Sequence, residues 1–458
     1  MPRKIIRHPF PNKIFDISCI VYLKRNRDGR ADMMGKPVFG VVADDLTGGM
    51  ETAAMLVAHG VDCAFVTDPE AVDTIGDVDA IVVAQKTRVI PAAQAVARTE
   101  RAARALLARA TRQIFFKYCA TFDSTDDGNI GPVADILMAT TGAPYAAFCP
   151  ASPALKRTVY NGHLFLGSQL ISESPKRHDP LTPMTDPDLV RVLQRQTKTR
   201  VGLLAHPAVS EGGTTLRLAV ADQAAEGIRY FITDTIYDRD LDAIAELTCD
   251  WPLMTGNATI VQHYPALWRQ RGLLTGEPHT RSLQPVSGKG VVLSGSCAER
   301  TLEQLADFER SHPVLRIDLT DIDSAESAVD AALRWALPKL ETGPVGLSTS
   351  AAPEAVAAAQ ARYGRDGAAA LGEKIVGDLA VAFHGAGVRR FVVAGGETSG
   401  SVVERLGIRG LNVGPYGGPG VGTATTNGDD PVAFCLKSGK LGPVDLFTRA
   451  LASMKNPE

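Results

Sequence analysis

Paired cysteines are absent from this sequence. Its seven cysteines stand singly, and no two of them form a C-x-x-C pair. A zinc site or a redox motif therefore has no support. An odd, dispersed set of thiols indicates a reducing compartment rather than a disulfide framework, so we expect a cytoplasmic protein. The seven are Cys19, Cys63, Cys119, Cys149, Cys249, Cys297 and Cys435.

Long hydrophobic runs and an excess of one charge are also lacking. No apolar run approaches the roughly 20 residues that a membrane span needs. The net charge is only -3, which gives no general signature of polyanion binding. We therefore expect neither a membrane nor a nucleic acid as partner. An anionic substrate would have to be held by local positive groups.

Two nucleotide-binding motifs are missing. No G-x-x-x-x-G-K-[ST] stretch occurs, which excludes a Walker-type NTPase. No G-x-G-x-x-G with a suitably placed acidic partner occurs either, and this weakens the case for a dinucleotide cofactor.

What the sequence does have is a regular alternation of apolar and amphipathic stretches from Val38 onward. Short, almost wholly apolar runs such as Val38–Ala43 and Phe391–Ala394 alternate with amphipathic ones such as Ala92–Ala110. This alternation is typical of a parallel sheet covered on both faces. A polar stretch with Gly276, Pro278, Pro285 and Gly288 interrupts it.

The sequence therefore predicts an α/β fold of two domains with mostly parallel sheets and a cleft between them. The predicted domains cover residues 37–275 and 285–458. Residues 1–36 differ from the rest because they are basic and irregular, with three prolines. We expect them to be a disordered or non-core extension, with Met33 or Met34 as a sensible start; a cleaved targeting peptide is the alternative.

The first predicted strand ends in two aspartates, Asp44 and Asp45. Adjacent carboxylates repel each other, so they need a hydroxylated ligand, a cation or the N–H groups of the next helix. The alternative is that Asp45 or Thr47 only caps that helix. After the third strand, Lys86 and Arg88 are spaced to bind one carboxylate, unless they are simply solvated.

The fourth strand leads into a long polar loop, Lys117–Gly131. Hydroxyls, three carboxylates and two glycines gather between strand and helix, around Asp123 and Ser124. Such a loop could hydrogen-bond sugar hydroxyls and supply a general base.

Three glycine-containing turns follow strands in the second half. They are Ser294–Cys297, Gly395–Thr398 and Lys437–Lys440. Glycine lets backbone N–H groups approach an anion without a Cβ in the way, and the next helix N-terminus adds partial positive charge. One such turn is commonplace, but three in one sheet favour a phosphate site.

Four segments together resemble the four-carbon acid sugar kinase family. The segments are Ala43–Gly48 (ADDLTG), Asp123–Thr125 with Gly128–Gly131 (DST..GNIG), Pro183–Asp186 (PMTD) and Gly395–Gly400 (GGETSG). They occur in the family's order, and the resemblance runs from residue 37 to the end. It implies an N-terminal sugar-acid-binding domain, a C-terminal nucleotide-binding domain, and ATP with Mg²⁺. The implied ATP contacts are Ser294, Gly395, Gly396, Glu397, Thr398 and Gly439.

Within the family, the context around Asp123 and the loop ending in Asp186 look most like the 3-oxo-tetronate kinase branch. The family pattern has an acidic residue where this chain has Tyr416, and a proline where it has Gly422. If that acid helps to place magnesium or to shape the nucleotide loop, affinity or rate is altered here.

The resemblance implies transfer of the γ-phosphoryl group of ATP to the terminal O4 hydroxyl of a four-carbon acid. Lys86 and Arg88 are expected to hold the substrate carboxylate, and Asp44 and Ser124 to bind its hydroxyls. Asp45 and Asp123 are the candidate catalytic residues. A threonate or erythronate kinase, a sugar-acid dehydrogenase and a non-catalytic sugar-acid-binding protein remain alternatives. The oligomeric state stays open, a homodimer included.

Overall fold

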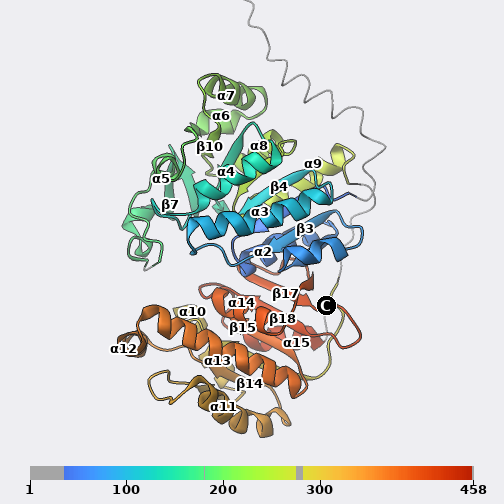
Figure 1. Cartoon of the computed structure of the whole chain (residues 1–458), viewed down its shortest axis with the longest axis vertical. Coiled ribbons are helices and arrows are strands. Elements are labelled where there is room, and N and C mark those ends of the chain that lie inside the picture. Colours follow the sequence, from blue (N-terminus) through green and yellow to red (C-terminus); the bar gives the residue numbers. More distant parts are fainter. Residues whose placement is uncertain (1–35, 180, 275–281, 456–458) are drawn as a thin grey trace, which may run out of the picture.

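A single long β-sheet runs through the whole protein. The computed structural model describes residues 36–179, 181–274 and 282–455, so nearly all of the predicted extension and part of the predicted domain boundary lie outside the described residues. Fifteen strands form this sheet (Figure 1). In spatial order they are β13 (Val314–Arg316), β14 (Val345–Ser348), β12 (Lys289–Ser294), β15 (Val388–Ala394), β18 (Ala433–Lys437), β17 (Val421–Thr425), β16 (Gly410–Val413), β2 (Cys63–Val66), β3 (Ala80–Ala84), β1 (Phe39–Ala43), β4 (Gln113–Lys117), β11 (Leu253–Gly256), β5 (Ala146–Cys149), β10 (Tyr230–Thr233) and β9 (Val201–Leu204).

The sheet is parallel except around β16 and β17. These two strands pair antiparallel with each other, and they join β18 of the second half to β2 of the first, also antiparallel. The predicted mostly parallel α/β fold is therefore confirmed. The sequence gave no sign of the antiparallel pair, because β16 is short and β17 is built of small residues.

Each half of the sheet has a point where the order of strands reverses. β1 lies between β3 and β4, and β12 lies between β14 and β15. Ligands of open α/β sheets bind beyond the carboxyl ends of strands at such points. The two points carry Asp44 after β1 and Ser294 at the end of β12.

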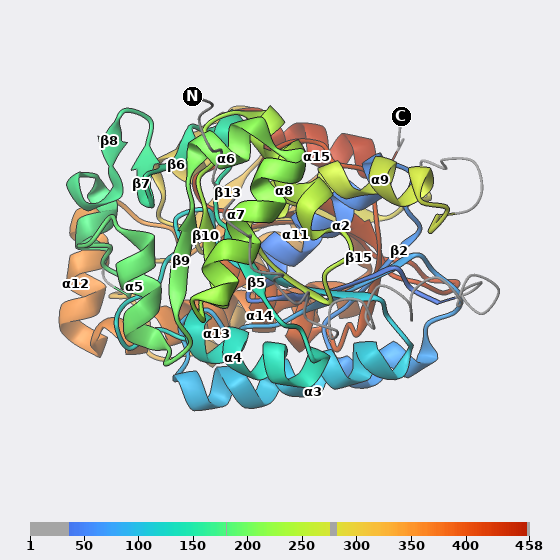
Figure 2. The same cartoon turned by 90° about the horizontal axis from the view of Figure 1, so that it is seen from above.

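Alternate strand residues face two layers of helices in the first half. Val41 and Phe115 belong to one buried cluster, whereas their neighbours Val42 and Phe116 belong to another. Figure 2 shows α3 and α4 along one side of the sheet, and α2, α8 and α9 along the other. The helices are α2 (Leu46–Ala58), α3 (Ala92–Ala108), α4 (Ile130–Thr141), α5 (Leu189–Gln196), α6 (His206–Glu211), α7 (Gly213–Ala225), α8 (Asp238–Thr248) and α9 (Tyr264–Gln270).

The second half is built in the same way. Phe391 and Val393 of β15 face one buried cluster, and Val392 and Ala394 face another. Helices α11, α13 and α14 contribute to the first cluster, and α10 and α15 to the second. The helices are α10 (Glu299–Glu309), α11 (Ala325–Leu340), α12 (Pro353–Tyr363), α13 (Arg365–Gly385), α14 (Gly396–Arg405) and α15 (Leu446–Lys455).

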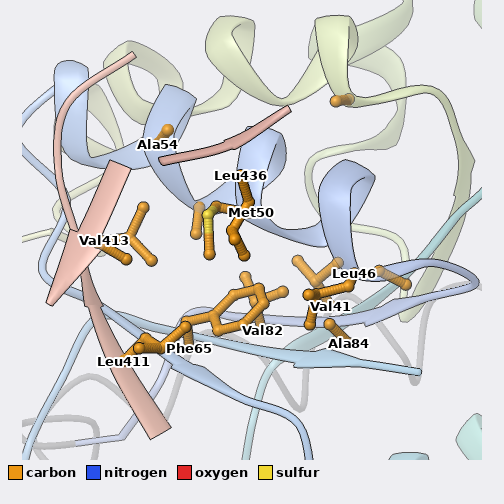
Figure 3. Packing of buried hydrophobic residues seen from close by; sticks show 14 of the residues in the cluster. Val41, Leu46, Met50, Ala54, Phe65, Val82, Ala84, Leu411, Val413 and Leu436 are labelled. Atoms are coloured by element: carbon orange, nitrogen blue, oxygen red, sulfur yellow. The ribbon is translucent and has the colours of Figure 1, made fainter. Parts of the chain in front are cut away.

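The two halves share one part of the core. Met50 of α2 lies between Phe65 of the first half and Leu411 and Leu436 of the second (Figure 3). All four side chains are almost completely buried. Gly422 lies so close to α2 that a Cβ there would overlap Met50. The halves are therefore joined by packing as well as by the sheet.

A small antiparallel sheet and strand β11 were not predicted. The small sheet consists of β6 (Arg157–Tyr160), β7 (His163–Leu166) and β8 (Gln169–Leu170). Turns at Asn161-Gly162, both with positive φ, and at Gly167 connect its strands. Asn-Gly is a strong hairpin signal, so this element was readable from the sequence.

Candidate active site

Asp44 and Asp45 lie at the carboxyl end of β1, where they are neutralised by two cations. Arg88 donates to both oxygens of Asp44 through Nε and Nη2, each at 2.7 Å, and Nη2 also lies 2.7 Å from Oδ1 of Asp45. Lys117, at the end of β4, donates to the same Oδ1 at 2.9 Å. Two buried carboxylates thus face two cations, which makes burial of the group tolerable.

Asp45 also begins helix α2. Its Oδ1 accepts from the N–H of Gly48 at 3.2 Å, and its Oδ2 accepts from the hydroxyl of Thr47 at 2.7 Å. This N-cap explains why α2 starts at Leu46 and not at the predicted Gly49. Burial works against the ionised form, but Arg88 and Lys117 outweigh it and hold the pKa of Asp45 well below its usual range. Asp45 is therefore ionised at neutral pH.

Asp123 has its own cation, Lys176. Their side chains lie 2.7 Å apart, and the hydroxyl of Thr121 donates to Asp123 at 2.7 Å. Lys176 also pairs with Asp179 at 2.8 Å. Burial opposes ionisation of Asp123, but Lys176 and then Arg88 keep its pKa below the usual value.

Ser124 is buried beside Asp123 and is held by a residue from another helix. Its Oγ accepts from Nε2 of Gln196, at the end of α5, at 2.8 Å. Gln196 also accepts from the N–H of Gly131 at 3.0 Å, which ties α5 to the start of α4. A cavity of about 260 Å³ adjoins this loop, with Ser124 and Asp127 on one wall and Met184 and Asp186 on another.

Lys86 points to the second half of the protein. Its Nζ lies 3.5 Å from Glu373 of α13 and 3.7 Å from Glu397 of α14. Gly400 of α14 approaches its side chain so closely that a Cβ there would lie 2.8 Å from Cε of Lys86. Lys86 also lines a cavity of about 710 Å³ between α3 and α14. Lys86 and Arg88 therefore contact different partners, although both follow β3.

The three glycine turns come together because β12, β15 and β18 are neighbours. The N–H of Gly395 donates to the carbonyl of Lys437 at 2.9 Å, and the N–H of Gly295 donates to Ala394 at 3.1 Å. The hydroxyl of Thr398 fills the space beside both Gly295 and Gly395, which has a φ of 122° that favours glycine. The expected convergence of these turns is thus seen.

The remaining nucleotide candidates surround this corner. Ser294 is fully buried, and its hydroxyl shares a hydrogen bond of 2.7 Å with Ser350. Gly439 packs against Ser296 with no room for a Cβ. The side chain of Glu397 is 61% exposed. Gly396, Glu397 and Thr398 form the first turn of α14, so their N–H groups are unpaired within the helix.

The aspartate cluster and the glycine corner face each other across the two halves. A Cβ on Gly396 would lie 3.6 Å from the hydroxyl of Thr47, the same hydroxyl that donates to Asp45. Helices α2 and α14 are in contact. A donor-rich helix N-terminus therefore lies next to an ionised carboxylate, with the hydroxyl between them.

The loop that departs from the family pattern is supported by α2. The N–H of Gly420 donates to the carboxylate of Glu51 at 3.0 Å. Burial and the charge of Glu51 raise the pKa of Tyr416 to about 12. Glu51 thus gives the loop a carboxylate contact from another part of the chain, although Tyr416 itself carries none.

Several residues of this site were missed from the sequence. Lys117 is buried at a strand end, and a lysine closing an apolar run was the signal that could have found it. Lys176, Gln196 and Glu51 gave no such signal, because each meets its partner only through the fold.

A magnesium ion would have few protein ligands here. No group of three or more His, Cys, Asp or Glu side chains that could hold a metal occurs among the described residues. Mg²⁺ usually keeps several waters and takes one or two carboxylates together with substrate phosphates. Glu397, at the corner, is a carboxylate that fits this role.

The described helices include none that is both long and apolar enough to cross a membrane.

Comparison with known proteins identifies relatives of nearly full length. A sugar-binding N-terminal domain model matches residues 39–264, and a nucleotide-binding C-terminal domain model matches residues 291–447. A 3-oxo-tetronate kinase of Cupriavidus necator is 43% identical over 423 residues, covering 92% of this chain and 98% of that protein. A solved structure from Salmonella typhimurium LT2 has a TM-score of 0.79 and 36% identity, over 90% of this chain and 98% of that one. Another, from Haemophilus influenzae, has a TM-score of 0.73 and 34% identity, over 91% and 100%.

Proposed function

Because the chain belongs to the four-carbon acid sugar kinase family, we propose that it phosphorylates the terminal O4 hydroxyl of 3-oxo-tetronate with ATP. The products are 3-oxo-tetronate 4-phosphate and ADP. The observation that carries this proposal is the contact between Gly396 of the glycine corner and Thr47 beside the ionised Asp45. We assign sugar-acid binding to residues 37–275 and nucleotide binding to residues 285–458.

The glycine corner would hold the triphosphate. The free N–H groups at the start of α14, from Gly396 to Thr398, suit phosphate oxygens, and the helix N-terminus adds partial positive charge. Gly439 and Ser294 belong to the two adjoining turns. Mg²⁺, with Glu397 near it, would supply neutralisation of the charge that develops on the phosphates.

The aspartate cluster would hold the sugar acid. Nε and Nη2 of Arg88 are used by Asp44 and Asp45, whereas Nη1 makes no hydrogen bond to the described residues. That group suits a substrate carboxylate, with Lys86 as the second cation. Asp44 and Ser124 would bind hydroxyls. The carboxylates that already fix Arg88 reduce the entropy lost on binding.

Asp45 is better placed than Asp123 to act on the reacting hydroxyl. Asp45 lies one hydroxyl away from Gly396, whereas Asp123 is paired with Lys176 in the first half. A carboxylate with a lowered pKa is a weak base. Phosphoryl transfer through a loose transition state depends mainly on positioning and on electrostatics, so an orienting carboxylate is sufficient. Asp123 would then fix the substrate from the other side.

Closure of the two halves would exclude water from the reaction. Lys86 already links β3 to Glu373 and Glu397 of the second half. Water exclusion limits wasteful hydrolysis of ATP and strengthens the electrostatic interactions in the site.

A coupled ADP-release assay with ATP and Mg²⁺ tests the proposed function. The panel contains 3-oxo-tetronates, threonates and erythronates of both configurations, with a no-substrate control. We expect the highest kcat/KM with a 3-oxo-tetronate. A preference for threonate or erythronate would move the protein to that branch of the family. If no four-carbon acid gives turnover above background, the kinase assignment is wrong.

A further inference from the structure

Lys437 is a buried lysine for which the reaction described above has no use. It is the last residue of β18, and none of its surface is exposed. Its Nζ donates to the hydroxyl of Thr301 at 2.9 Å, to Oε1 of Gln304 at 2.7 Å and to the carbonyl of Gly439 at 3.0 Å. Lysines are rarely buried to this extent without a carboxylate partner.

All three donors of this ammonium group are used by neutral acceptors. No carboxylate among the described residues forms a salt bridge with Lys437. An ammonium has three N–H donors, so none is left for a phosphate oxygen. Lys437 can therefore affect a bound nucleotide only through the groups that it holds.

The carbonyl of Gly439 is the held group that matters. It accepts from Lys437 and also from the hydroxyl of Thr301, at 2.8 Å, so both of its lone pairs are occupied. Because the peptide bond is planar and trans, the N–H that follows this carbonyl points in the opposite direction. The N–H of Lys440 is thereby directed away from the buried lysine.

The backbone of Lys437 is fixed to the glycine corner as well. Its carbonyl accepts from the N–H of Gly395, and Gly439 packs directly against Ser296 of the turn after β12. One residue thus connects the side of the third turn to the other two.

We propose that Lys437 is a positioning residue for ATP, which orients the Gly439–Lys440 peptide so that its N–H faces the phosphates. This inference rests on the proposed function, because it assumes that the glycine corner binds ATP. It adds a residue that touches neither substrate.

The charge state of Lys437 supports a measurable pH dependence. Burial lowers the pKa of Lys437 to about 8, which the adjacent Cys435 opposes and Arg300 of α10 reinforces. Burial raises the pKa of the Cys435 thiol to about 12, so that thiol stays neutral over the working range. Above pH 8 the amine keeps two donors for three acceptors. We therefore expect ATP affinity to fall as the pH rises through about 8.

The test measures binding of a non-hydrolysable ATP analogue to the full chain by calorimetry. Lys437→Met is expected to weaken binding about tenfold, roughly the effect of losing one charged hydrogen bond, and to leave the KM for the sugar acid unchanged. The wild-type loss of affinity between pH 7 and 9 should disappear in this variant. Lys455→Met, which removes an exposed lysine from α15, is the matched control and should bind like wild type.

Thr301→Val provides a second variant if Lys437→Met does not fold. It removes the other donor to the Gly439 carbonyl and should also weaken analogue binding. Unchanged affinity in the folded variants, or wild-type affinity that does not vary from pH 7 to 9, overturns the role of Lys437 alone. A wild type that binds no nucleotide overturns the proposed function, and this inference falls with it.

Discussion

Asp123 combines a catalytic assignment with an unusual backbone. Its φ is 34°, and the preceding Phe122 has a φ of 61°. Asparagine tolerates this region better than most residues. Asp123→Asn should therefore keep the fold, while it weakens the charge contact with Lys176. We expect turnover to fall at least ~100-fold, as for loss of a key positioning group or base.

Steady-state kinetics and a thermal melt check this expectation together. A variant with a near-wild-type melting temperature and low turnover supports the role of Asp123. Near-normal turnover removes Asp123 from the catalytic residues.

Lys117 is expected to matter for stability more than for binding. Its side chain is only 4% exposed and neutralises Asp45, whose other cation is Arg88. Lys117→Met would leave two buried carboxylates with one cation, which should cost about 3–5 kcal/mol of unfolding free energy. Urea unfolding measures this. Lys198→Met, at an exposed position in the loop before β9, is the control; equal losses in both variants would contradict the argument.

At the residue scale, the sequence revealed the acids of the site but not all of their partners. Asp44 and Asp45 stood out because two adjacent carboxylates at a strand end need a cation or a helix start, and the structure shows both. Lys176 could not be predicted, because it reaches Asp123 from a separate loop that carries no regular pattern. Pairings between distant segments are set by the fold.

At the scale of elements, strands and helices with strong periodicity were predicted to within a few residues. The strand Ala80–Ala84 and the helix beginning at Ala92 are examples. Strands β16 and β17 were missed because their stability comes from pairing with β2 and β18, and not from their own composition. The glycine turns were found since their chemistry is local.

The loop that carries Lys176 should make stability depend on acid. Despite partial burial, the hydrogen bond from Lys176 helps to lower the pKa of Asp179 to about 2 from 3.8, and the pKa of Asp123 is also lowered. A depressed carboxyl pKa stabilises the folded state above the unfolded pKa. That stability is lost as the pH falls from about 4 to about 2.

Lys176→Met should reduce this acid sensitivity. We expect the free energy of unfolding to fall less steeply between pH 4 and pH 2 in the variant than in wild type, as measured by chemical denaturation at each pH. Parallel slopes for the two proteins would show that the three side chains do not interact in solution.

At the scale of the whole molecule, the two halves predicted from the sequence share one sheet. Thr67 donates to the backbone carbonyls of Arg409 and Ile408, next to the pairing of β2 with β16. The shared core around Met50 adds apolar contacts between the halves (Figure 3). The sequence predicted the two-part organisation, but it could not predict that the parts would be joined edge to edge.

This shared core predicts a single unfolding transition. Gly422→Ala would force Met50 to move, and overpacking of this kind costs about 1–3 kcal/mol. Calorimetry of the variant should show one transition at a lower temperature. Gly343→Ala is the control, since a Cβ there meets nothing within 4 Å. Two separate transitions, of which only one shifts in Gly422→Ala, would mean that the halves unfold independently.

The arrangement as a whole gives each half one task, with the phosphate tail held by the second half and the acid presented by the first. A crystal structure of the full chain with a non-hydrolysable ATP analogue and a four-carbon acid tests this most directly. We expect the terminal phosphate within hydrogen-bonding distance of the N–H groups at the start of α14, with the acid's carboxylate on Arg88. A triphosphate bound away from Gly396 would contradict the account.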